Sequence, residues 1–139
     1  MRRPASERED AVIRAIVIDD YQEHVDTLVN TLNMYGCDAR GATQGAEALL
    51  ICETWQPHLV ICDGLLEGMR AWQFAHNMLR SDQGQRPYLV ALTGFGSTLQ
   101  RRLCEETGYD EYVTKPIELS TLLTWVQKAR QRAETVPGF

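Results

Sequence analysis

Four short apolar runs in the sequence each end in a residue that can take part in phosphoryl chemistry. The acid pair Asp19-Asp20 follows residues 15–18, Asp63 follows residues 59–62, Thr93 follows residues 88–92, and Lys115-Pro116 follows residues 111–114. The carboxyl ends of strands in an open parallel sheet form the crevice where ligands bind. If the runs are strands, three carboxylates, a hydroxyl and an ammonium group meet at one rim.

The chemistry predicted for this rim is the transfer of a phosphoryl group to a carboxylate. A carboxylate such as Asp63 can attack phosphorus and form an acyl phosphate. The transferring oxygens need a cation, and carboxylates such as Asp19 and Asp20 suit Mg²⁺, which keeps waters and phosphate oxygens as its other ligands. Lys115 supplies a compact positive charge. Thr93 can donate a hydrogen bond to the same phosphoryl group.

Each of these residues also has a purely structural interpretation. Asp20 has Glu23 three positions on, so the two form a capping box for a helix as readily as Asp20 forms a metal ligand. Asp63-Gly64 is typical of a turn. Thr93 alone is typical of a core or turn position, and Lys115 of an exposed surface. Only their joint placement at the strand ends favours the functional interpretation.

The elements that would position these residues alternate between strands and helices. Helices are expected over about residues 21–35, 43–54, 69–79, 97–107 and 119–132, with a further strand over residues 37–41. Thr43 and Ser97 are expected N-caps. The second helix should bury Ala46, Leu49 and Leu50, and the fourth Leu99 and Leu103. Five strands and five helices in this order predict right-handed crossovers and a three-layer α/β sandwich.

Length and composition suit one domain with one core. The chain has 139 residues, of which 44% are hydrophobic and 24% charged, with a net charge of −5. The acidic balance argues against nucleic acid as a partner, and no apolar run is long enough to span a membrane. We expect a flexible N-terminal tail over residues 1–12, a domain over residues 13–132, and a C-terminal tail over residues 133–139.

The cysteines and histidines show no metal-binding spacing. Four cysteines are scattered without a C-x-x-C pair, which argues against zinc and favours a reducing, cytoplasmic location. His24, His58 and His76 lack partners at ligand spacing, and we interpret them as exposed or half-buried side chains. None of them lies in a sequence motif typical of a phosphorylated histidine.

The ordered set of motifs resembles the receiver domain of two-component response regulators. The resemblance covers about residues 13–130 and is carried by Ile16-Val17-Ile18-Asp19-Asp20, Gly45-Ala46-Glu47-Ala48-Leu49, Pro57-His58-Leu59-Val60-Ile61-Cys62-Asp63, Ala91-Leu92-Thr93-Gly94 and Tyr112-Val113-Thr114-Lys115-Pro116. The separations from Asp63 to Thr93 and to Lys115 are those typical of the family. Any one motif is weak, whereas the set at these spacings is specific.

This resemblance implies a flavodoxin-like fold with a five-stranded parallel sheet in the order 2-1-3-4-5. It implies that Asp63 accepts a phosphoryl group from a histidine kinase or a histidine phosphotransfer protein. Asp20, Asp63 and the backbone carbonyl of Leu65 would hold Mg²⁺, with Asp19 acting mainly through water.

It further implies that Thr93 and Tyr112 form a switch pair and that the Lys115-Pro116 peptide is cis. Output would pass to a downstream protein through the face made by the fourth helix, the fifth strand and the fifth helix. A phosphorylation-dependent dimer is one option for that face. The chain would be a switch and not an enzyme with a turnover substrate.

The chain departs from the family pattern just after Asp63. Glu67 and Ala71 stand where proline and glycine are usual, and Gly64 directly follows the acceptor. In the family, the positions of Leu65 and Phe95 flank the path of the attacking water; both residues are apolar here, so we expect slow self-dephosphorylation. Two other readings remain open, a pseudo-receiver scaffold that is not phosphorylated and an aspartyl-nucleophile phosphatase. Leu65 disfavours the phosphatase, because it stands where a second acid is needed.

Overall fold

The structure, a computed structural model, describes residues 11–80, 86–94 and 97–135. Its strands are β1 (Arg14–Ile18), β2 (Asp38–Ala42), β3 (Leu59–Asp63), β4 (Tyr88–Thr93) and β5 (Glu111–Thr114). Its helices are α2 (Gln22–Met34), α3 (Gly45–Trp55), α4 (Ala71–Leu79), α5 (Thr98–Thr107) and α6 (Leu119–Ala133). Strands and helices alternate along the chain, as the sequence predicts.

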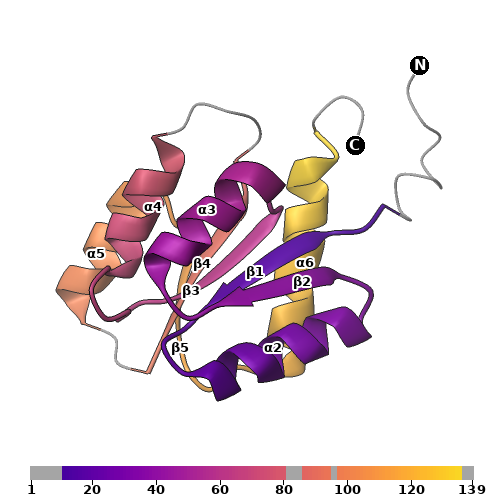
Figure 1. Cartoon of the computed structure of the whole chain (residues 1–139), viewed down its shortest axis with the longest axis horizontal. Coiled ribbons are helices and arrows are strands. Elements are labelled where there is room, and N and C mark those ends of the chain that lie inside the picture. Colours follow the sequence, from indigo (N-terminus) through magenta and orange to yellow (C-terminus); the bar gives the residue numbers. More distant parts are fainter. Residues whose placement is uncertain (1–10, 81–85, 95–96, 136–139) are drawn as a thin grey trace.

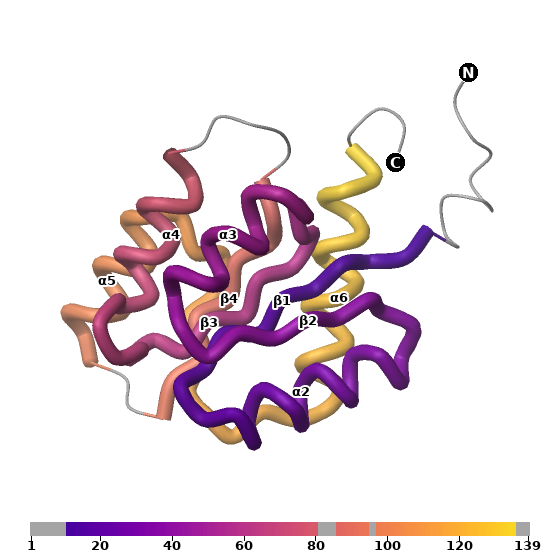
Figure 2. Tube along the Cα trace, viewed as in Figure 1, coloured from indigo at the N-terminus to yellow at the C-terminus, as the bar shows by residue number. Residues whose placement is uncertain are grey.

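The five strands form one parallel sheet in the order β2-β1-β3-β4-β5 (Figure 1). Figure 2 shows how β1 enters the sheet between β2 and β3, so the chain returns past its own first strand before it continues outward. The predicted flavodoxin-like α/β sandwich and its strand order are therefore confirmed.

Helices cover both faces of the sheet and create two separate apolar cores. On one face, α3, α4 and α5 pack around Ile16, Ile18 and Phe74. On the other, α2 and α6 pack around Val17 and Trp125. Neighbouring residues of β1 thus point into different cores, which explains why its apolar run is continuous and not alternating with polar residues.

Some predicted helix details are wrong. Ala46 and Leu50 are exposed, as is Leu99, of which 62% is accessible, and the buried positions are instead Ala48, Cys52 and Cys104. Thr43 does not cap α3, whose N-cap is Gln44 without a side-chain hydrogen bond. Only the Ser97 cap is confirmed, since its side chain accepts a hydrogen bond from the Gln100 amide.

His58 is also placed differently from the prediction, because only 7% of it is exposed. It lies just before β3, and its Nδ1 accepts a hydrogen bond of 2.9 Å from the Arg14 amide. Its own backbone amide donates to the Arg14 carbonyl, at 2.8 Å. The imidazole thus extends the pairing of β1 with β3 beyond the ladder.

The chain ends are described only in part. Most of the predicted N-terminal tail and residues 136–139 lie outside the described residues, so their flexibility stays a prediction. Within the described part, the Ala11 carbonyl accepts a hydrogen bond from Arg130, and Ala133, the last residue of α6, is fully buried. None of the helices in the described ranges has the length and apolar character needed to cross a membrane.

Candidate functional site

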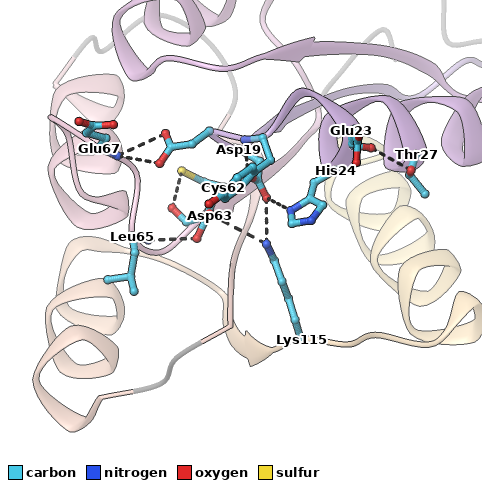
Figure 3. A network of polar contacts seen from close by, with 11 residues as sticks. Asp19, Glu23, His24, Thr27, Cys62, Asp63, Leu65, Glu67 and Lys115 are labelled. Carbon is cyan, nitrogen blue, oxygen red and sulfur yellow. Dashed lines mark hydrogen bonds and ion pairs between the residues drawn. The ribbon is translucent and has the colours of Figure 1, made fainter.

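The carboxyl ends of β1, β3, β4 and β5 bring the predicted residues together at one rim, where Figure 3 shows Asp19, Asp63 and Lys115. Asp63 ends β3 and pairs in register with Leu92, one residue before Thr93. Thr93 pairs with Thr114, and the Thr93 carbonyl accepts a hydrogen bond of 2.7 Å from the Lys115 amide. Adjacent strands that end at the same level therefore set the positions of the site residues.

Asp19 is the most buried acid of the site, with 4% of the residue exposed. Its Oδ1 accepts a hydrogen bond from the Tyr21 amide at 2.9 Å, and its Oδ2 lies 2.9 Å from Lys115 Nζ and 3.3 Å from His24 Nδ1. Burial raises the pKa of Asp19, but the Tyr21 amide, Lys115 and His24 together outweigh it, so the pKa lies below its ordinary value. Asp19 is thus held as an anion.

The pKa of Asp63 is shifted in the opposite direction from that of Asp19. Burial raises its pKa, and the charges of Asp19 and Asp20 add to this, while the Leu65 amide and Lys115 oppose it; the pKa of Asp63 lies above its ordinary value. The Leu65 amide donates to Oδ1 at 3.1 Å and fixes the direction of the carboxylate. The uncompensated negative charge around Asp63 favours a cation at the rim.

Lys115 lies nearer to Asp19 than to Asp63. Its Nζ is 2.9 Å from Asp19 Oδ2 and 4.0 Å from Asp63 Oδ2. The Lys115-Pro116 peptide is cis, as the resemblance implies. One ammonium group therefore faces two carboxylates from the opposite side of the rim (Figure 3).

Asp20 is exposed and points toward the loop that follows β3. Its two carboxylate oxygens lie 3.3 and 3.0 Å from the Glu67 amide nitrogen, which donates to them. The capping-box interpretation of Asp20 is wrong, because α2 takes Tyr21 as its N-cap without a side-chain hydrogen bond. The Asp20 carboxylate therefore does not cap α2 and is held by the Glu67 amide.

The donors at the rim fit Mg²⁺ better than a metal that needs a closed cage. Across residues 11–80, 86–94 and 97–135, no three His, Cys, Asp or Glu side chains gather as a complete metal-binding group. Mg²⁺ uses one or two protein carboxylates and keeps several waters, and its preferred donors are the hard oxygens that Asp20, Asp63 and the Leu65 carbonyl carry. The donor set thus suits a partly hydrated cation.

Thr93 and Tyr112 are both buried, with 0% and 6% exposed. A Cβ added at Gly64 would lie 3.1 Å from Thr93 Cβ and 3.4 Å from its Oγ1, so the residue after Asp63 packs directly on Thr93. The Arg101 guanidinium of α5 lies over the Tyr112 ring, 5.0 Å from its centroid. The first contact joins the acceptor loop to β4, and the second joins β5 to the α5 surface. Phe95 lies outside the described residues.

Sequence reasoning missed the two neighbours of the acid pair. His24 is an exposed histidine, as expected, but its ring reaches Asp19 from the first turn of α2. Its position five residues after Asp19 was the available signal, since a helix starting at Gln22 turns that residue back toward the strand end. The Glu67 amide had no sequence signal, because the path of the loop decides where a backbone group points.

Comparisons with known proteins agree with this geometry. Residues 15–127 match the family described as "Response regulator receiver domain". The chain is 32% identical over 125 residues to the DNA-binding response regulator MtrA of Mycolicibacterium smegmatis, covering 90% of this chain and 54% of that protein. It is 24% identical over 124 residues to the DNA-binding dual master transcriptional regulator RpaA of Synechocystis, covering 89% and 52%. The chain spans about half the length of these relatives.

Solved structures show the same fold. A CheY-like response regulator receiver domain protein from Methanospirillum hungatei superposes with a TM-score of 0.81 at 20% identity, covering 91% of this chain and all of that one. A response regulator receiver domain protein from Clostridium thermocellum superposes with a TM-score of 0.80 at 21% identity, covering 89% and 98%.

Proposed function

Because the chain belongs to the family of response regulator receiver domains, we propose that it takes up a phosphoryl group on Asp63 in two-component signalling. The observation that carries this proposal is the placement of Asp63, whose side chain is 14% exposed at the end of β3 and lies 4.0 Å from the Lys115 ammonium. A carboxylate that is accessible, fixed in direction and faced by a cation is suited to attack phosphorus.

The donor is a phosphohistidine of a histidine kinase or a histidine phosphotransfer protein. An oxygen of Asp63 attacks the phosphorus, the new O–P bond forms, and the N–P bond breaks with its electron pair returning to the imidazole, which takes a proton from water. Lys115 neutralises a phosphoryl oxygen, and the Thr93 hydroxyl donates to another. The Leu65 amide keeps the carboxylate aligned through its 3.1 Å hydrogen bond.

Mg²⁺ is the proposed cofactor, held by Asp20, Asp63 and the Leu65 carbonyl, with Asp19 acting through water. When bound, it supplies the positive charge that the transferring oxygens require. The protein itself contributes the acids: the lowered pKa of Asp19 keeps that carboxylate anionic, and the Asp20 side chain is exposed next to it in sequence.

Thr93 and Tyr112 are the proposed switch pair, and the output face comprises α5, β5 and α6. The contact of Arg101 with the Tyr112 ring supports this, because it joins a buried side chain of β5 to an exposed side chain of α5. A downstream protein, or a second copy of the chain, would read that face. The curated relatives are named as DNA-binding regulators, so the predicted absence of a nucleic-acid partner stays a prediction, as does the cytoplasmic location.

Incubation with Mg²⁺ and a small phosphodonor tests the proposal directly. We expect the intact protein to gain the mass of one phosphoryl group, and Asp63→Asn to gain nothing. Asp26→Asn, an exposed acid of α2, is the matched control and should gain the group normally. A folded protein that gains no mass would contradict the proposal and favour a scaffold. Multiple turnover on phosphate esters would favour a hydrolase instead.

A further inference from the structure

The backbone amide of Glu67 holds the carboxylate of Asp20. Its nitrogen lies 3.0 Å from Oδ2 and 3.3 Å from Oδ1, so the donated hydrogen faces both oxygens (Figure 3). The contact joins residues 47 positions apart and ties the loop after β3 to the end of β1. It exists because position 67 has an N–H, which proline would lack.

The segment that carries this amide is fixed on both sides and open in between. Leu66 is 1% exposed and anchors one side in the core. Met69 anchors the other, packed so closely on Gly45 that an added Cβ there would lie 2.7 Å from its sulfur. Glu67 and Gly68 are exposed between these anchors, and Gly68 has a φ of +78°, in the left-handed region.

A hollow lies beside the contact and gives the segment room to move. Its volume is about 470 Å³, and it is lined by Asp20, residues 43–46 and residues 67–69. Apart from Met69, the residues that line it are polar or small, so a displaced Glu67 amide would meet water there and keep a hydrogen-bond partner.

We propose that the Glu67 amide competes with the divalent cation for Asp20, so that Glu67 acts on metal affinity through the Asp20 carboxylate. This rests on the proposed function, in which Asp20 is a ligand of Mg²⁺. The hydrogen of the amide carries partial positive charge and faces both carboxylate oxygens, so a cation on either oxygen repels it. Metal binding therefore weakens the contact between the Glu67 amide and Asp20, and this contact weakens metal binding in return.

The test compares two variants that lose the same side-chain charge. Glu67→Pro removes the amide hydrogen, whereas Glu67→Ala keeps it. The dissociation constant of Mg²⁺ alone is measured by titration followed in backbone amide NMR spectra, with circular dichroism to verify folding. We expect Glu67→Pro to bind Mg²⁺ about tenfold more tightly than Glu67→Ala, the factor for losing one hydrogen bond to a charged group. Equal or weaker binding by a folded Glu67→Pro would overturn the inference.

The unmodified chain gives a second measurement that does not depend on the proline variant folding. Saturating Mg²⁺ should move the Glu67 amide proton upfield, because it loses a charged acceptor, while amides of α6 stay in place. An unmoved Glu67 resonance in a chain that binds Mg²⁺ would overturn the inference and leave the proposed function intact. Absence of Mg²⁺ binding in all forms would overturn both.

Discussion

Lys115 forms its short ion pair with Asp19, at 2.9 Å, although Asp63 is the proposed acceptor of the phosphoryl group. The Asp19 side chain is 5% exposed and the Lys115 side chain 26% exposed, so this pair is largely removed from water. Lys115 therefore has two roles in this arrangement. It balances a buried carboxylate of the fold, and it stands within 4.0 Å of the acceptor.

The first prediction concerns that pair. Lys115→Met should lower the free energy of unfolding by roughly 1–3 kcal/mol, because it leaves the Asp19 carboxylate without its ammonium group. In an Asp19→Asn background the same change should cost less, since no buried charge remains. Urea denaturation of the four members of this cycle measures the difference. Equal costs in both backgrounds would mean that the ion pair does not stabilise the fold.

The second prediction concerns pH and separates the two acids. The pKa of Asp19 is lowered by folding, so its contribution to stability is present above the unfolded value of 3.8 and is lost as pH falls through the folded value. Asp19→Asn should therefore destabilise the fold at pH 7 by an amount that holds down to about pH 3.8 and shrinks below that value.

The contribution of Asp63 to the free energy of unfolding should change with pH in the opposite direction. Its pKa is raised by folding, so its contribution is present below 3.8 and is lost as pH rises through the folded value. Asp63→Asn should stabilise the fold at pH 7, with the gain shrinking in acid. Unfolding free energies measured from pH 7 to well below 3.8 verify both signs, because the Asp19 window lies below 3.8 and the Asp63 window above it. If both variants changed the free energy of unfolding in the same direction, the opposite pKa shifts of Asp19 and Asp63 would be refuted.

The third prediction tests the packing of Gly64 on Thr93. Gly64→Ala places a methyl group 3.1 Å from Thr93 Cβ, so the threonine must shift by a few tenths of an ångström. Uptake of the phosphoryl group should slow about tenfold, because the hydroxyl leaves its working position. Gly94→Ala is the matched control, since its new methyl group meets nothing within 4 Å. Similar rates for both variants would show that Gly64 does not position Thr93.

The fourth prediction concerns His58, far from the rim. Burial, with the charges of Arg14 and Arg130, lowers its pKa to about 4 from the ordinary 6.5. The unfolded chain binds the proton more readily, so stability should fall as pH drops from about 6.5 to 4, by roughly 3 kcal/mol from this residue. His58→Asn retains a side-chain acceptor for the Arg14 amide and does not titrate. Its unfolding free energy should depend less on pH over that window, and an unchanged slope would contradict the assignment.

The fifth prediction concerns the lifetime of the phosphorylated form. Leu65 is half-buried beside Asp63 and cannot orient water, so phosphate release should take much longer than seconds. Leu65→Gln supplies an amide beside the acceptor and should speed release about tenfold. Leu65→Met keeps the apolar character and is the control. Release within seconds from the unmodified protein would refute the interpretation of this position.

The sequence predicts the part of the site that lies at the ends of strands. Asp19, Asp63 and Lys115 meet as expected, because parallel strands in register end at one level whatever the intervening loops do. The contact of Asp20 with Glu67 depends instead on a loop path, for which residue types carry no signal.

The sequence also predicts the wrong buried side for some helices. The buried positions of α3 are Gly45, Ala48 and Cys52, whereas apolar composition favours Ala46 and Leu50. The helix begins at Gly45, where Met69 packs against the backbone, so tertiary contact sets its rotation. A helix with apolar residues on several sides offers no unique stripe, and periodicity alone cannot choose between them.

The pairing of Asp19 with Lys115 also bears on the order in which the molecule folds. The contact spans 96 residues, whereas β1 pairs with β2 and β3 at shorter separations. Closing a longer loop costs more chain entropy, so contacts of high sequence separation form late. During synthesis, the acids of the rim would emerge well before the lysine that balances them. We therefore expect a chain to become competent for signalling only after β5 has joined the sheet. A chain whose synthesis has not yet reached β5 would not signal.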